Sequence, residues 1–131
     1  ANFVSSITPD GKTLTLIVGN RYQKNKKMKP GVSVSTQSSG GWSDPVPVDI
    51  NNAFIENNDG HYFLTQSRET MIMAIRRLDS YGGKDIYVSF LLPDGTWSEP
   101  LNLGNSINTS RENLLLSSFL LGYCSCSSYS F

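Results

Sequence analysis

The sequence contains an internal repeat, and this feature limits the possible folds more than any other. Residues 42–45 read WSDP, and residues 97–100 read WSEP, 55 positions later (97 − 42). Upstream of these motifs, Val32 matches Ile86 at an offset of 54 (86 − 32). A spacing kept this closely at separate points indicates two copies of one structural unit.

Two further matches extend the repeat in both directions. Residues 13–17 correspond to residues 71–75 at an offset of 58, and residues 50–51 correspond to residues 107–108 at an offset of 57. An offset that changes by only a few residues indicates small insertions in the loops of an otherwise constant unit.

Alternating hydrophobic residues predict four strands in each unit. The segment 70–77 is apolar on both of its alternating sets of side chains, which is typical of a strand in a sheet covered on both faces. The expected strands are 2–7, 12–19, 31–37 and 42–48 in the first unit, and 61–66, 70–77, 85–92 and 97–103 in the second.

Turn residues separate these strands. Asp94 and Gly95 follow a proline between two of them, and this combination favours a tight turn. Trp42 and Trp97 occupy the same place in the repeat, so we expect both to pack inside their units, with sugar or base stacking as the alternative. The structural residues of the repeat are then Trp42, Pro45, Asp94, Gly95, Trp97 and Pro100.

Four-stranded antiparallel units at such a period are typical of β-propeller blades. The expected fold is therefore all-β, with one blade at about 2–49, a second at about 61–104, and a partial third blade or tail at about 113–131. Because two blades cannot close a ring, we expect either a fragment of a larger propeller or a propeller completed by several copies. A β-sandwich also uses short strands, but it gives no reason for the repeated tryptophan motif.

The segments 85–109, 7–16 and 79–85 resemble the PD-type, WD-repeat-like propeller blades of TolB-like proteins from bacterial envelopes. The resemblance covers about residues 2–112 and is stronger in the second unit. It implies a periplasmic or cell-surface propeller that binds protein partners. No peptidoglycan-binding domain is carried over, because the chain has no OmpA-like segment.

Composition excludes several classes of function. The 131 residues include 11 basic and 11 acidic side chains, so no net charge favours nucleic acid. No window is apolar and long enough for a membrane span. With one histidine and two cysteines, we expect no metal site and no cofactor. His61 is the single histidine, and we expect no catalytic residues.

Two groups of residues are candidates for binding. The basic run contributes Arg21, Lys24, Lys26 and Lys27, which could hold an acidic partner, although solvated loops of this kind are common. Arg76, Arg77 and Tyr81 follow an inner strand and could line a channel or a protein-binding rim, with a local ion pair to Asp79 as the simpler alternative.

The expected function is a noncatalytic binding or scaffolding module that contacts proteins in a bacterial envelope. A glycan is an alternative ligand, and a homo-oligomer is an expected assembly. The alternative function is a piece of a glycan-processing or peptidase-associated propeller enzyme.

Overall fold

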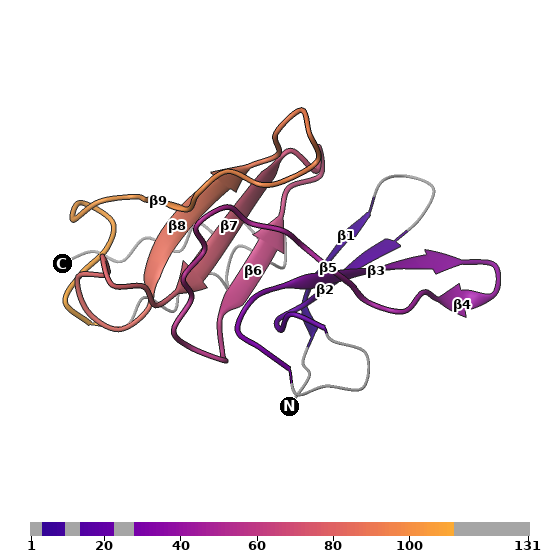
Figure 1. The fold of residues 1–131 in the computed structure, drawn as a ribbon, viewed down its shortest axis with the longest axis horizontal. Helices are drawn as coiled ribbons and strands as arrows, with labels where there is room; N and C mark the ends of the chain where they lie inside the picture. Colours follow the sequence, from indigo (N-terminus) through magenta and orange to yellow (C-terminus); the bar gives the residue numbers. More distant parts are fainter. Residues whose placement is uncertain (1–3, 10–13, 23–27, 112–131) are drawn as a thin grey trace, which may run out of the picture.

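The computed structural model describes residues 4–9, 14–22 and 28–111. In these residues the fold is all-β, with two antiparallel sheets and no helix, as the sequence predicts. Figure 1 shows the two sheets beside one another, the first in indigo to purple and the second in magenta to orange.

The first sheet is built around three longer strands, β1 (Val4–Pro9), β2 (Leu14–Val18) and β3 (Ser33–Ser38). Two short strands, β4 (Gly41–Trp42) and β5 (Val46–Pro47), pair with the two halves of β3. The predicted strand 42–48 is therefore interrupted. Pro45 lies at the interruption, and proline has no N–H to donate to a ladder.

The second sheet has the same order of strands. It runs β6 (His61–Leu64), β7 (Thr70–Ile75), β8 (Asp85–Phe90) and β9 (Leu101–Asn102), each antiparallel to the next. The turn before β9 is closed by the Asp94 carboxylate, which accepts bonds from the backbone N–H and the hydroxyl of Thr96. Gly95 there has a φ of 84°, a conformation that glycine adopts without strain.

The pairing registers confirm the repeat and correct one of its offsets. Val34 pairs with Val46 in the first sheet, as Val88 pairs with Leu101 in the second, which keeps the offsets of 54 and 55. The second strands differ from the prediction. Thr15 pairs with Thr36 while Thr70 pairs with Phe90, so β2 corresponds to β7 at 55 (70 − 15) and not at 58. A difference of three residues would move every side chain to the opposite face.

A serine pair repeats with its hydrogen bonds in both units. The Ser35 hydroxyl donates to the Ser43 carbonyl at 2.6 Å, and the Ser89 hydroxyl donates to the Ser98 carbonyl at 2.7 Å. The hydroxyl oxygens of Ser43 and Ser98 in turn accept from the backbone N–H of Thr36 in β3 and of Phe90 in β8. The serine of the WSDP and WSEP motifs therefore fastens the last segment of each unit to its third strand.

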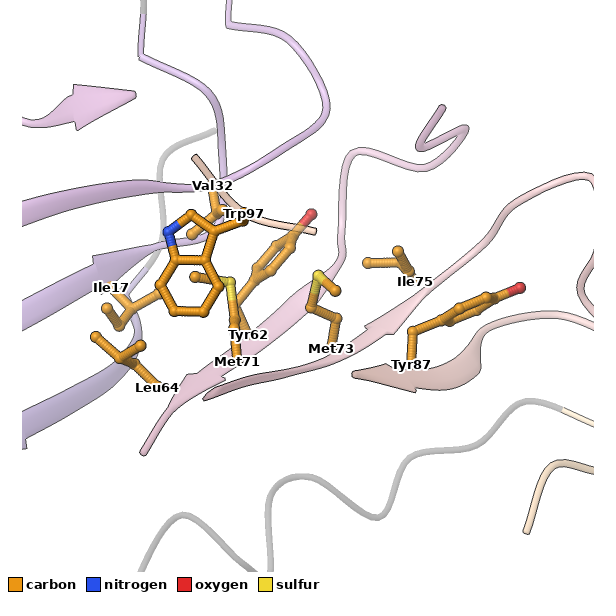
Figure 2. Close-up of a cluster of buried hydrophobic side chains, with 9 residues drawn as sticks. All are labelled: Ile17, Val32, Tyr62, Leu64, Met71, Met73, Ile75, Tyr87 and Trp97. Atoms are coloured by element: carbon orange, nitrogen blue, oxygen red, sulfur yellow. The ribbon is translucent and has the colours of Figure 1, made fainter. Parts of the chain in front are cut away.

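The two sheets share one hydrophobic core (Figure 2). Ile17 and Val32 come from the first unit and the other members come from the second. The buried side chains are Ile17, Val32, Tyr62, Leu64, Met71, Met73, Ile75, Tyr87 and Trp97. The first strands also approach one another, because the hydroxyls of Ser5 and Ser6 on β1 each donate to the Tyr62 carbonyl on β6 at 3.0 Å.

The two repeated tryptophans have different surroundings. Trp97 is buried in the core as predicted, and Figure 2 shows its indole beside Val32 and Ile17. Trp42 is exposed over 44% of its surface, so the expectation that it packs inside is wrong. The reason is positional. Trp97 belongs to the second sheet and is covered by the first, whereas no further sheet among the described residues covers Trp42 in the first.

Tyr62 fills the core beside a residue that has to be glycine. A Cβ at Gly60 would lie 2.7 Å from the Tyr62 hydroxyl oxygen and 3.0 Å from Cγ2 of Ile75. Burial, with a smaller contribution from the Asp59 charge, raises the pKa of Tyr62 well above its usual value, so the phenol stays neutral.

We expect Gly60→Ala to lower the free energy of unfolding by about 1–3 kcal/mol, because the added methyl overpacks a closed core. Tyr62→Phe in the same background should recover part of this loss by removing the crowded oxygen. Urea unfolding measures both. Gly40→Ala is the control, because its Cβ would meet no atom within 4 Å. Equal stability of Gly60→Ala and the wild type would contradict the packing argument.

Candidate binding site at the loop end

The order of the strands gathers several long connections at one end of both sheets. Their described residues are 19–22, 28–32, 48–60, 76–84 and 103–111, here called the loop end. In Figure 1 the segments 76–84 and 103–111 lie at the lower left, away from the turns 65–69 and 92–96 at the top. Arg21 of the first predicted binding group falls at this end, as do Arg76, Arg77 and Tyr81 of the second, because both groups follow the second strand of their unit.

Arg77 holds the loop end together. Its side chain is 8% exposed, and its guanidinium donates to the carbonyl oxygens of Asn52 at 2.7 Å and Ala53 at 2.9 Å. It also pairs with Asp79 at 3.0 Å and with Glu99 at 3.1 Å. These bonds join the connection between the units to the second sheet, so the local ion pair considered for Arg77 is present.

An aromatic ring completes the surroundings of Arg77. The guanidinium carbon lies 5.6 Å from the centroid of the Tyr87 ring, within the range of a cation–π contact. Burial raises the pKa of Asp79, but the hydrogen bonds from Arg77 and Tyr87 outweigh it and leave the pKa below its usual value. The carboxylate therefore stays charged beside the guanidinium near neutral pH.

A second ion pair fastens the start of β6. The ammonium of Lys84, itself buried, donates to the Asp59 carboxylate at 2.6 Å. The hydrogen bond from Lys84 and then that from Asn57 hold the pKa of Asp59 below its usual value.

Arg21 lies beside a small cavity at the same end. Its guanidinium donates to the Val48 carbonyl at 2.9 Å and pairs with the Asp49 carboxylate at 2.6 Å. The cavity has a volume of about 130 Å³. Its walls come from the first unit and the connection that follows it, at Arg21, Pro30, Gly31, Val32, Val48, Ile50, Ala53, Phe54 and Ile55.

The other predicted binding residues differ in how accessible they are. Arg76 is exposed, and its guanidinium lies 3.4 Å from the Glu56 carboxylate. The Tyr81 side chain is also exposed, while its backbone N–H donates to Asp85 at 2.7 Å. Lys24, Lys26 and Lys27 lie outside the described residues; Arg21 and Lys29, on either side of them, pair through their backbones.

Two exposed apolar side chains at the loop end are not among the binding residues predicted from the sequence. Leu78 is 89% exposed and Phe54 is 71% exposed. Both lie in irregular segments, where no hydrophobic periodicity marks them. Arg77 connects the two segments that carry them. It precedes Leu78 in the chain, and it donates a hydrogen bond to the carbonyl of Ala53, which precedes Phe54.

Among residues 4–9, 14–22 and 28–111, no group of three or more histidine, cysteine or acidic side chains could hold a metal ion. Asp85 is fully buried, and its carboxylate accepts bonds from the Tyr81 N–H and the Asn102 amide. His61 is half-buried at the start of β6.

Comparisons with protein-family models, with curated proteins and with solved structures find no match to this chain. Within the part of the chain that the structure describes, no helix is long and apolar enough to cross a membrane.

We expect Arg77→Lys to lower the free energy of unfolding by about 2 kcal/mol, because an ammonium cannot replace the guanidinium at two carbonyls and two carboxylates. The matched control is Arg76→Lys at the neighbouring exposed position, which should change stability by less than about 0.5 kcal/mol. Denaturant unfolding of both variants decides the matter, and similar effects at the two positions would contradict the role given to Arg77.

We expect Asp59→Asn to cost about 1 kcal/mol at pH 7, a small value because solvent screens the largely exposed carboxylate. The lowered pKa of Asp59 means that its contribution is complete above the ordinary carboxyl pKa of about 4 and is lost as the pH falls through the folded-state pKa. Thermal unfolding from pH 7 to pH 3 should therefore narrow the difference between variant and wild type. Asp44→Asn, at an exposed carboxylate, serves as the control. A difference that does not narrow as the pH falls would rule out the charge as its cause.

Proposed function

We propose that this chain is a noncatalytic binding module made of propeller-type blades, and that a protein partner contacts its loop end. The observation that carries the proposal is the combination of exposed apolar side chains with a bonded framework beneath them. Phe54, Leu78 and Tyr81 project from segments that Arg77 joins by hydrogen bonds.

This combination suits protein recognition. Large apolar and aromatic side chains supply most of the binding energy in protein interfaces, especially when their backbone is already ordered. The exposed ion pair of Arg76 and Glu56 would then form part of a polar border around the apolar contacts. The partner would be a protein segment that presents an apolar side chain to this surface.

The blade interpretation is supported by the repeat and by the face-to-face core. Two sheets of equal strand order pack through Trp97, and their first strands lie against each other, as blades do around a propeller axis. The resemblance to TolB-like blades supports a place in a bacterial periplasm or on a cell surface.

The test is capture of proteins from a bacterial envelope extract on the immobilised chain. We expect Leu78→Asp, and Tyr81→Ala as a second variant, to lose at least tenfold of the retained partner, because each removes exposed apolar contact area from the interface. Stability should stay within about 0.5 kcal/mol of the wild type, because both side chains are largely in solvent.

The matched control is Gln66→Asp, which adds the same charge to an exposed turn at the opposite end. Equal retention by the wild type, Leu78→Asp and Gln66→Asp would contradict the proposal. Retention of a glycan in place of a protein would contradict it as well.

A further inference from the structure

Each sheet has two faces, and the described residues contain one junction between the two units. The face of the second sheet that carries Tyr62, Leu64 and Trp97 packs against the first unit through Ile17 and Val32. The pairing registers identify the corresponding residues on the other face of each sheet. The junction within the chain can therefore serve as a template for contacts made by those two faces.

The first sheet presents an uncovered copy of the face that the second sheet buries. Through the registers, Val4 corresponds to Tyr62, Ile7 to Leu64, and Trp42 to Trp97. We call Val4, Ile7 and Trp42 the leading face; they are 56%, 50% and 44% exposed, whereas their counterparts are 1%, 5% and 7% exposed. Three large apolar side chains in the same arrangement are thus buried in one unit and solvated in the other.

The second sheet presents a face that matches, at two apolar positions, the face that the first sheet uses to bury them. Ile72 corresponds to Ile17, and Val88 corresponds to Val34, through the pairs that these residues form on neighbouring strands. Phe63 pairs with Ile72, so its side chain lies on the same face. We call Phe63, Ile72 and Val88 the trailing face; all three are half-buried.

We propose that the trailing face of one copy of this chain binds the leading face of a second copy, in the way that the first unit binds the second unit within the chain. The occupant is a second copy because the chain carries both halves of a junction that it already forms internally. Val4, Ile7 and Trp42 of one copy lie over Phe63, Ile72 and Val88 of the other. The zero formal net charge of the chain adds no long-range repulsion between copies.

The junction is heterologous, since different surfaces of the two copies meet. An open assembly therefore keeps one free leading face at one end and one free trailing face at the other, where further copies can bind. This proposal does not depend on the loop end, which lies at the ends of the strands and not on either face of a sheet.

Sedimentation velocity of the full chain over a concentration series tests the proposal. The wild type should form species larger than a dimer. Trp42→Glu destroys only the leading face and Phe63→Asp destroys only the trailing face, so each variant alone should sediment as a monomer. An equimolar mixture of the two should form a dimer and nothing larger, because only one intact junction is left between them.

Val88→Lys is a second trailing-face variant in case Phe63→Asp does not fold, with circular dichroism as the check, and Gln66→Asp should assemble like the wild type. A monomeric wild type, assembly of either single variant, or a mixture that stays monomeric would each overturn the proposal. Loss of assembly with normal capture of a partner by the loop end, or the reverse, separates this inference from the proposed function.

Discussion

The burial of Trp97 between two sheets is the contact on which the rest of the structure depends. A tryptophan side chain removes a large apolar area from water, and this one touches the first unit while belonging to the second. Its backbone takes part as well: the Trp97 N–H donates to the Asp49 carbonyl, and the Trp97 carbonyl accepts from Asn51, both at 2.9 Å. One residue thus fixes the distance between the sheets, the position of the connection and the closure of the core.

The polar residues at the loop end join the two units by hydrogen bonds and ion pairs, in addition to the contacts of the hydrophobic core. Arg77 is buried in spite of its charge because two carboxylates and two carbonyls take the place of water around it. The connection that it binds contains Asn52 and Phe54, both with positive φ, a backbone conformation that the surrounding contacts must enforce. Exposed side chains on this connection are therefore presented by an ordered backbone.

The all-β class, the strand order and the repeat could be predicted from the sequence, because alternation and a recurring motif are local patterns. The offset of β2 could not: an alternating apolar strand matches another equally well at several shifts, and only the pairing with β3 decides between them. The prediction that Trp42 packs inside its unit is also wrong, for a physical reason. A repeated residue takes the environment of its counterpart only if a neighbouring sheet supplies it. Arg77 was noticed as a candidate, but its partners at residues 52, 53 and 99 are distant in sequence, and no local pattern connects them.

The pairing of Trp97 with residues 49–51 also has a consequence for how the molecule unfolds. Ile50 forms a parallel bridge with Trp97, so the connection that follows the first sheet serves as an additional edge of the second. Neither sheet can lose its structure without exposing the core of the other and releasing this segment. The two units should accordingly melt in a single cooperative transition, and the boundary between them in the sequence is not a boundary in stability.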